Sequence, residues 1–337
     1  MADLHLSFAM TPYDRMLPLI NGEVKPDGIT LDYQGMPGQV PGVFYDQLKF
    51  QRYDVSEMSM SSFMLERAKG FPYRLLPVFH NRQFSYTMLI IRRSSGIRVD
   101  HPEDLKGKRI AIGDYQQTIG LWTRGILLHE FGVKPDDMIW NQTRGEHYSH
   151  TGASGTKPPV ELHFADAEIG TLFSRGEIDA AFGWGGPGNA GGHALQRADI
   201  DIRGNPEFTP LFSDQKAEAA RFYKKTGIYP PHHTTAVRES ILKEHPWVAR
   251  SLMEAFEESK KIAMTRLRNQ TLYVFMEFYQ DEIRDLMGKD PFAYGIKANL
   301  KAIQMAQQIS HEQSLTPKVQ PIEELFAEEV FLMEERL

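Results

Sequence analysis

The sequence predicts an α/β protein of two lobes, followed by a helical C-terminal region. Strand-like runs alternate with helical ones along the first half of the chain, and residues 240–337 carry apolar side chains at helical spacing. A chain of 337 residues also exceeds the usual size of a single hydrophobic core, so two lobes are expected.

The first 92 residues alternate in the way that is typical of a lobe built on a mainly parallel sheet. The strand-like runs are LHLSFAM, ITLDYQG, DVSEMSM, YRLLPVF and YTMLIIRR. Helical segments are predicted between them, from Pro12 to Ile20 and at VFYDQLKF and SSFMLERAK.

A second series begins with HPEDLKGKRIAIGDY, a capped turn that leads into a buried strand. It continues through the helices TIGLWTRGILLHEFG and ADAEIGTLFSRG to the strand EIDAAFGW. Residues 142–160 and 183–193 are rich in Gly, Pro, Ser and Thr, and they are predicted to be loops that cover a cleft. In the C-terminal region, one helical face carries Val248, Leu252, Ala255, Phe256 and Ile262.

Composition and charge exclude several classes of function. The net charge of −6 is spread along the chain, without the basic blocks that contact nucleic acid or anionic membranes. The absence of cysteine excludes disulfides, thiolate nucleophiles and cysteine-based metal sites, and no apolar run approaches the roughly 20 residues that span a bilayer. The N-terminal MADLHLSFAMTPYDR lacks the pattern of a secretory signal, so we expect a cytoplasmic protein.

Two motif-like stretches are interpreted as loops. GWGGPG at residues 183–188 has the spacing of a dinucleotide-binding turn, but it contains a proline and no convincing helix follows it. His147 and His150 are three residues apart, a spacing that suits a divalent metal on a helical turn. The flanking Gly, Ser and Thr favour a mobile loop there instead.

The segment KKTGIYPPHHTT, residues 224–235, combines two prolines with two histidines. Proline fixes its own φ and restricts the residue before it, so Tyr229 to His233 should be extended. Because successive side chains of an extended segment point in opposite directions, His232 and His233 are not expected to serve the same site.

Several segments between about residues 5 and 265 occur in a recognisable order. They are YDRMLPLINGEVKPDGITLDY, YDVSEMSMSSFM, LLPVFHNRQF, GIRVDHPEDLKGKRIAIGDYQQTIGLWTRGILLHEFGV, GEIDAAF and YKKTGIYPPHHTTAVRESILKEHPWVARSLMEAFEESK. As an ordered set they resemble the 4,5-dihydroxyphthalate decarboxylase family. Arg82 and His233 match the pattern of that family, whereas His80, Tyr86 and His232 are particular to this chain.

The resemblance implies a fold similar to the type 2 periplasmic binding proteins, with a ligand cleft between the lobes. The chain would cross between lobes near residues 92–98 and 225–238, which gives one lobe of residues 1–92 plus 236–337 and another of residues 93–235. PPHHTT would then lie at the floor of the cleft. The implied reaction is decarboxylation of a hydroxylated aromatic dicarboxylate, 4,5-dihydroxyphthalate to 3,4-dihydroxybenzoate (protocatechuate) and CO2.

Such a reaction requires one acid, one base and cations for the carboxylates, with no organic cofactor demanded. His233 is favoured for proton transfer by the resemblance, and His232 and His80 by their closeness to the expected cleft strands. Glu57 is a candidate acid or metal ligand. A divalent metal held by these groups stays an alternative, because a catechol-like substrate chelates metals.

Arg15, Arg82 and Arg124 are candidate carboxylate clamps, since the planar guanidinium pairs with both carboxylate oxygens. The alternative for each is an ion pair on the surface or between the lobes. Ser59 and Ser61, at a strand end, either hydrogen-bond a ligand carboxylate or cap the next helix.

The stretch GDYQQTIGLW supplies Tyr115, Gln116 and Thr118 to the predicted substrate site, as a loop that leads into a helix N-terminus attractive to anions. Tyr115 and Trp184 are candidates for stacking on an aromatic ring, with core packing as the alternative.

A non-catalytic solute-binding protein of an ABC-type transporter is the alternative function, because its lobes, arginines and aromatic residues would look the same. The density of histidines near the cleft favours the enzyme. Self-association is also expected, because the C-terminal region carries exposed-looking aromatic residues, namely Phe275, Phe278 and Tyr279.

Overall fold

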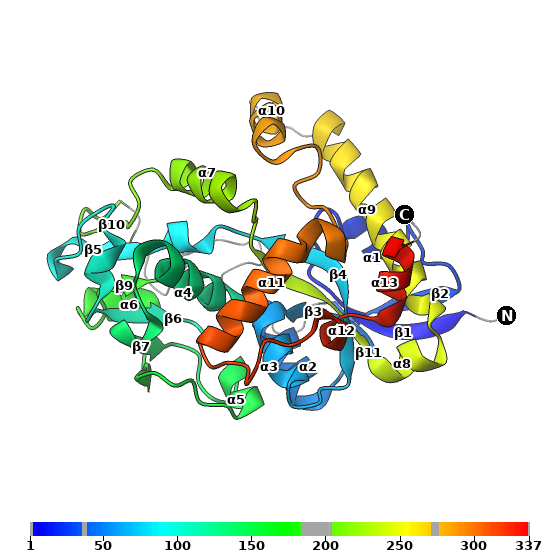
Figure 1. Ribbon diagram of the computed structural model, residues 1–337, viewed down its shortest axis with the longest axis horizontal. Helices are drawn as coiled ribbons and strands as arrows, with labels where there is room; N and C mark the ends of the chain where they lie inside the picture. Colours follow the sequence, from blue (N-terminus) through cyan, green and yellow to red (C-terminus); the bar gives the residue numbers. More distant parts are fainter. Residues whose placement is uncertain (1–2, 36–38, 183–201, 203, 271–275, 336–337) are drawn as a thin grey trace.

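The computed structural model describes residues 3–35, 39–182, 202, 204–270 and 276–335, which form two sheets with helices packed around them (Figure 1). One sheet lies in each lobe, and the chain passes from the first sheet to the second and back again.

The first sheet has five strands in the order β2-β1-β3-β11-β4. The strands are β1 (Leu4–Ala9), β2 (Ile29–Tyr33), β3 (Val55–Ser59), β4 (Tyr73–Arg82) and β11 (Pro231–Arg238), and the helices between them are α1 (Leu17–Ile20), α2 (Gln39–Phe50) and α3 (Met60–Arg67). β1 is parallel to β2 and β3, whereas β11 is antiparallel to both β3 and β4. All five residues of β3 are buried, as expected for a strand in the interior of a sheet.

The second sheet has six strands in the order β10-β5-β9-β6-β7-β8. Its strands are β5 (Ile90–Arg92), β6 (Arg109–Ile112), β7 (Ile139–Gln142), β8 (Leu162–Phe164), β9 (Ala180–Ala181) and β10 (Phe208–Pro210), and its helices are α4 (Thr118–Phe131), α5 (His150–Ser154), α6 (Ile169–Ser174) and α7 (Gln215–Thr226). β6 is parallel to β7 and β9, so the carboxyl ends of these strands meet at one edge of the sheet.

The first passage between the lobes lies earlier in the chain than the expected residues 92–98, and the return passage lies within the expected residues 225–238. YTMLIIRR was expected to complete the first sheet, but its residues Ile90–Arg92 pair with β9 and β10 of the second sheet, so the chain crosses before residue 90. The return passage follows α7 and ends at Pro231, the first residue of β11. Proline has no N–H to donate to a neighbouring strand, so within a sheet it is tolerated at the first residue of a strand, where Pro231 lies.

Residues after β11 are largely helical, as predicted. The helices are α8 (Glu239–Glu244), α9 (Trp247–Gln270), α10 (Met276–Met287), α11 (Ile296–Glu312), α12 (Ile322–Leu325) and α13 (Glu328–Glu335). In the described part of the chain, no helix combines the length and the apolar character needed to cross a membrane. α10 stands away from the sheets at the top of Figure 1, with Phe278 and Tyr279 65% and 55% exposed. Phe275 lies outside the described residues.

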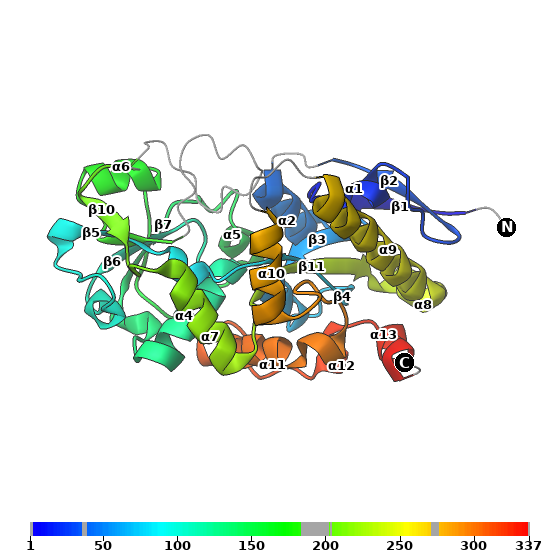
Figure 2. The same ribbon diagram turned by 90° about the horizontal axis from the view of Figure 1, so that it is seen from above.

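Helix α11 joins the two lobes, and it lies across both of them in the two views of Figures 1 and 2. Near its start, Asn299 accepts a hydrogen bond of 2.5 Å from Arg82 at the end of β4. Just beyond its end, Gln313 accepts one of 2.9 Å from Arg124 of α4. The last turn of α11 packs so closely on α4 that a Cβ on Gly125 would lie 2.4 Å from Cδ1 of Ile309.

The core is continuous between the lobes. A single cluster of buried apolar side chains contains Phe8 and Phe79 from the first sheet together with Trp122 of α4, Trp140 of β7 and Ile309 of α11. The helical C-terminal region therefore braces both lobes, rather than forming a separate unit.

Candidate active site

A buried carboxylate organises the centre of the first lobe. Glu57 of β3 has no exposed surface and accepts three hydrogen bonds. The backbone N–H of Thr11 donates to Oε2 at 3.0 Å, and Oε1 accepts from the Tyr13 hydroxyl at 2.7 Å and from His233 Nδ1 at 2.6 Å. Burial alone would raise the pKa of Glu57, but the hydrogen bond and charge of His233 lower it well below its usual range. Glu57 is therefore ionised.

The partner of this carboxylate is His233 of β11, which lies opposite Ser59 of β3 in the register of the sheet. A carboxylate can only accept hydrogen bonds, so the proton of the pair must lie on Nδ1 of His233. Nε2 has no hydrogen-bond partner among the described residues, and the side chain keeps 9% of its surface exposed. The edge of the Phe44 ring packs on the imidazole, with the ring centroids 4.9 Å apart. This arrangement orients His233 and leaves Nε2 available for proton transfer.

The other two predicted histidines are buried and neutral. His80 hydrogen-bonds the Thr235 hydroxyl through Nε2 at 2.6 Å and stacks on Tyr13, and burial lowers its pKa to about 3. Burial likewise lowers the pKa of His232 to about 3, and neither of its ring nitrogens has a hydrogen-bond partner within the described part of the chain. His80 thus stacks on Tyr13, which hydrogen-bonds the Glu57 carboxylate. In the described part of the chain, His232 has no hydrogen-bond partner in common with His233.

The predicted strand-end serines link the two lobes. Ser59 and Thr118 hydrogen-bond through their hydroxyls at 2.9 Å, and the backbone N–H of Ser61 donates to the same Thr118 oxygen at 3.0 Å. Next to them, the Ser62 hydroxyl lies 2.6 Å from Nδ1 of His150 in α5. The first residue of α4, Thr118, and the start of α5 therefore close against the amino end of α3.

His150 is a second imidazole at this junction. It is 1% exposed, and its Nε2 has no partner among the described residues. Its ring packs against the same Phe44 that contacts His233, with the centroids 5.5 Å apart. Burial lowers its pKa to about 4 against the opposing effect of the Asp114 charge, and the charges of Arg144 and His233 act in the same direction as burial. His150, which was expected in a mobile loop, instead begins a helix capped by Ser149.

The residues Tyr115 and Gln116 of GDYQQTIGLW make their contacts within the second lobe. Tyr115 is fully buried, and its ring stacks under the guanidinium of Arg124, 3.7 Å from the ring centroid. Gln116 is fully buried, and it donates to the Thr156 carbonyl at 2.9 Å and accepts from Ser154 at 3.0 Å. Trp184 lies outside the described residues.

Among the candidate arginines, Arg15 contacts Tyr13, whose hydroxyl donates to Glu57. Its guanidinium packs on the rings of Tyr13 and Phe292, each 4.8 Å away, and it donates to the His80 carbonyl. Arg82 and Arg124 instead direct their guanidinium groups at carbonyl and amide oxygens of the protein, as described above for α11. These contacts favour a structural role for both.

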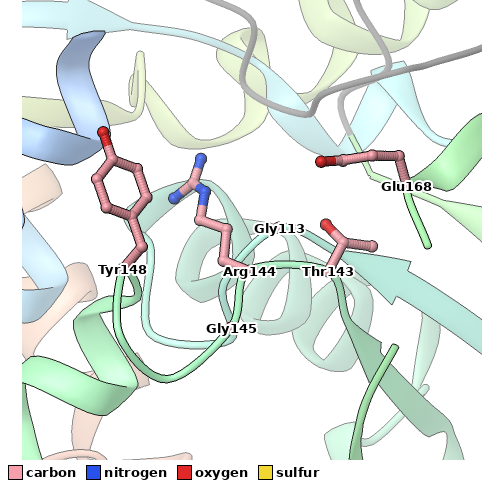
Figure 3. Close-up of a pocket in the computed structure, with 6 residues that line it drawn as sticks. All are labelled: Gly113, Thr143, Arg144, Gly145, Tyr148 and Glu168. Atoms are coloured by element: carbon pink, nitrogen blue, oxygen red, sulfur yellow. The ribbon is translucent and has the colours of Figure 1, made fainter. Parts of the chain in front are cut away.

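A pocket of about 370 Å³ lies at the carboxyl ends of β6 and β7. Figure 3 shows Arg144 and Tyr148 projecting from one loop on one side of it and Glu168 approaching from the other side. Its lining residues are Gly113, Thr143, Arg144, Gly145, Tyr148 and Glu168. Tyr148 also stacks on Tyr45 of α2, with the centroids 6.2 Å apart, so the pocket borders the first lobe.

Sequence reasoning did not identify Phe44, His150 or Arg144 as site residues. His150 and Arg144 belong to the stretch interpreted as a loop, where side-chain partners come from distant parts of the chain. The sequence signal available for Arg144 was its position two residues after a half-buried strand, next to the carboxyl edge of a parallel sheet.

The described residues contain no group of three or more His, Asp or Glu side chains that could hold a metal ion. Glu57, His80 and His233 approach one another, but Oε1 of Glu57 is hydrogen-bonded to Nδ1 of His233 and Nε2 of His80 to Thr235. These atoms are thus committed to hydrogen bonds within the protein.

Comparison with solved structures identifies the fold. The chain is similar to the periplasmic aliphatic sulphonate-binding protein SsuA of Escherichia coli, with a TM-score of 0.56 and 13% identity over 98% of this chain and 100% of that one. It is also similar to a putative SsuA of Methylobacillus flagellatus, with a TM-score of 0.55 and 12% identity over 100% and 95%. A family model described as "ABC transporter, phosphonate, periplasmic substrate-binding protein" matches residues 33–153. The predicted periplasmic-binding-protein-like fold is confirmed.

Curated relatives identify the family. A 4,5-dihydroxyphthalate decarboxylase of Comamonas testosteroni is 34% identical over 333 residues, which cover 96% of each chain. A protein of the same name from Pseudomonas putida is 31% identical over 66% of this chain and 83% of its own. Because the first of these matches extends through both lobes and the C-terminal helices, the chain belongs to the 4,5-dihydroxyphthalate decarboxylase family.

Proposed function

We propose that this protein is a carboxy-lyase that converts 4,5-dihydroxyphthalate to protocatechuate and CO2, with His233 as its proton-transfer residue. The observation that carries the proposal is the pair formed by Glu57 and His233. The 2.6 Å hydrogen bond fixes the tautomer of the imidazole, and Nε2 remains available to a substrate between the lobes. The relatives support the choice of substrate, because the two named above carry this activity in their names.

The reaction needs an electron sink before the carboxylate can leave. Protonation of the carboxylate-bearing ring carbon, with loss of the proton from the hydroxyl para to it, gives a keto tautomer. The bond to the carboxylate then breaks, its electron pair returns to the ring, and the oxygen is protonated again. The net change is the replacement of one carboxylate by hydrogen with uptake of one proton, so no organic cofactor is required.

His233 is suited to deliver the proton to the ring carbon. An imidazolium at this position is stabilised by the Glu57 carboxylate, which is itself held ionised by Thr11, Tyr13 and His233. The apolar edge of Phe44 beside the imidazole limits access of water to the same face. Arg15, which is 13% exposed beside Tyr13, provides a cation close to the buried carboxylate.

The test is to incubate the purified protein with 4,5-dihydroxyphthalate and to follow CO2 release and the ring product by chromatography. Release of one carboxyl group is expected, and it should be lost in His233→Ala while calorimetry still detects substrate binding. His5→Ala is the matched control, because His5 is 67% exposed and remote from Glu57.

Parallel samples treated with a chelator decide whether a divalent metal assists the reaction. Turnover by His233→Ala at the wild-type rate would contradict the assignment of this histidine. Binding by the wild-type protein without any turnover, in the presence and absence of added metal, would instead favour a solute receptor.

A further inference from the structure

His150 is a buried imidazole at the junction of the two lobes. It is the first residue of α5 in the second lobe, and α5 lies beside α2 of the first lobe in both Figure 1 and Figure 2. The residue is 1% exposed, and its Nε2 has no hydrogen-bond partner among the described residues. A buried polar atom without a partner is destabilising, so its position between the lobes indicates a partner that a ligand supplies.

The neighbours of Nδ1 determine which ring nitrogen carries the proton. Nδ1 of His150 lies 2.6 Å from the Ser62 hydroxyl, and that hydroxyl lies 3.4 Å from the backbone carbonyl of Gln116, which can only accept. Ser62 has a single hydrogen to donate. When it donates to the carbonyl it accepts from Nδ1, and all three groups are satisfied. The lone pair of Nε2 is then available, as a general base requires.

The same short segment of the first lobe holds both His150 and His233. His233 lies opposite Ser59 in the register of β3, and the Ser59 hydroxyl lies 3.3 Å from that of Ser62. The Phe44 ring contacts both imidazoles, with centroid distances of 4.9 Å to His233 and 5.5 Å to His150. The separation of the two imidazole centroids cannot exceed the sum of these distances. One aromatic ring with a carboxylate and a hydroxyl at opposite ends can span a distance of this size.

The two imidazoles have unlike surroundings. Nδ1 of His233 faces the Glu57 carboxylate, which stabilises an imidazolium, whereas Nδ1 of His150 faces a neutral hydroxyl. Burial lowers the pKa of His150 to about 4, and the charges of Arg144 and His233 act in the same direction. The Asp114 charge opposes them, but His150 remains neutral near pH 7. Two titratable groups kept in different protonation states within one site are suited to act as acid and base.

We propose that His150 is a second catalytic residue, the general base that takes the proton of the ring hydroxyl through Nε2 while His233 protonates the ring carbon para to that hydroxyl. The proposal rests on the proposed function for the reaction itself. It adds the group that opens the electron sink, which the Glu57–His233 pair does not supply.

The protons and electrons of this step balance. His233 gives one proton to the carboxylate-bearing carbon, His150 takes one from the hydroxyl, and the keto tautomer forms. When the bond to the carboxylate breaks, its electron pair moves through the ring to the oxygen, which regains the proton from His150 as CO2 leaves. His150 ends the cycle neutral, and His233 takes a new proton from the solvent.

The test is the pH dependence of kcat for His150→Asn, measured on the intact protein with 4,5-dihydroxyphthalate. The asparagine amide can still donate to Ser62, but it has no basic nitrogen in place of Nε2. Near pH 7, kcat should fall by about 100- to 10,000-fold, the usual contribution of a general base, while KM changes by less than about threefold.

The pH dependence separates a lost base from a disturbed structure. Without a base, the substrate hydroxyl must ionise before the ring carbon is protonated. The kcat of His150→Asn, divided by that of the wild type at the same pH, should therefore rise about tenfold per pH unit between about pH 6 and 8. Taking this ratio cancels the titration of His233, which both proteins share.

His163→Asn is the matched control, because His163 belongs to the same lobe and its side chain is 56% exposed. It should keep the wild-type kcat at every pH. Urea unfolding of each protein checks the fold. If His150→Asn does not fold, His150→Gln takes its place, since it also lacks a basic nitrogen.

The proposal is overturned if His150→Asn keeps the kcat of His163→Asn, or if its kcat is lowered by the same factor at every pH, as a purely structural role would require. In both cases, CO2 release by the wild type leaves the proposed function standing. If the wild type releases no CO2, the proposed function is wrong, and the base assigned to its reaction is wrong with it.

Discussion

Replacement of Glu57 by glutamine should remove the function of the carboxylate while keeping its shape. The carboxylate accepts from Thr11, Tyr13 and His233, and an amide cannot accept from all three donors without turning its NH2 group toward one of them. If the amide oxygen faces His233, the negative charge is lost. If the NH2 group faces His233, Nδ1 must become an acceptor and the proton must move to Nε2.

The size of the effect follows from the distance between the charges. With 2.6 Å between Nδ1 and Oε1, the charge centres are about 4 Å apart, which corresponds to about 4 kcal/mol at an effective dielectric constant of about 20. At about 1.4 kcal/mol for each factor of ten, loss of this interaction lowers the rate of an imidazolium-dependent step by about a thousandfold.

The assay is steady-state kinetics of CO2 release by Glu57→Gln, with unfolding in urea measured in parallel. A drop in kcat with KM changed by less than about threefold is expected, because the carboxylate acts through His233 rather than on the substrate. Asp54→Asn is the matched control. Asp54 also accepts three hydrogen bonds, two from Ser7 and one from Arg238, but it has no contact with His233.

Two results would refute the reasoning. One is a Glu57→Gln protein that folds normally and keeps more than about a tenth of the wild-type kcat. The other is a loss of kcat in Asp54→Asn as large as that in Glu57→Gln, since this would show that the rate responds to any lost carboxylate in the first sheet.

Three further predictions concern stability and shape. His80, His150 and His232 have pKa values lowered by burial to about 3, 4 and 3 from 6.5, so between about pH 4.5 and 6 the unfolded state binds more protons and stability is lost as the pH falls. Together the three residues should change the free energy of unfolding by roughly 4 kcal/mol per pH unit in this range. Urea unfolding at several pH values measures this dependence, and His232→Asn should reduce it by about a third. Gly125→Ala should destabilise the protein by about 1–3 kcal/mol, because its Cβ would collide with Ile309; an unchanged urea midpoint would contradict close packing of α11 on α4. Small-angle scattering should show nearly the same radius of gyration with and without saturating protocatechuate, and a clear decrease on binding would contradict a braced pair of lobes.

The alternation of strands and helices and the extended PPHH segment were accessible from the sequence. His233 and Glu57 were both named, because each lies on a strand whose character is visible locally. Their 2.6 Å contact was not predicted, since it depends on the antiparallel register of β11 against β3, and the two residues are far apart in the chain.

The partners of other residues are distant in sequence, so their surroundings could not be predicted. Arg82 and Arg124 look like ligand-binding arginines until α11 is placed beside them, where Asn299 and Gln313 accept their hydrogen bonds. His150 lies in a segment with loop-like composition, and its burial depends on Ser62 and Phe44 from the other lobe. The cytoplasmic location and self-association stay predictions, as does the role of Trp184.

Helix α11 has a consequence for what this architecture can communicate. A transport receptor changes the relative position of its two lobes when it binds its ligand, and a membrane partner recognises that change. Here the helix α11 and the residue just after it are hydrogen-bonded to both lobes, and the two lobes share a continuous core. A molecule built in this way is expected to have little shape change to transmit, and Glu57 and His233 are expected to keep their relative positions from one turnover to the next, as preorganised catalysis requires.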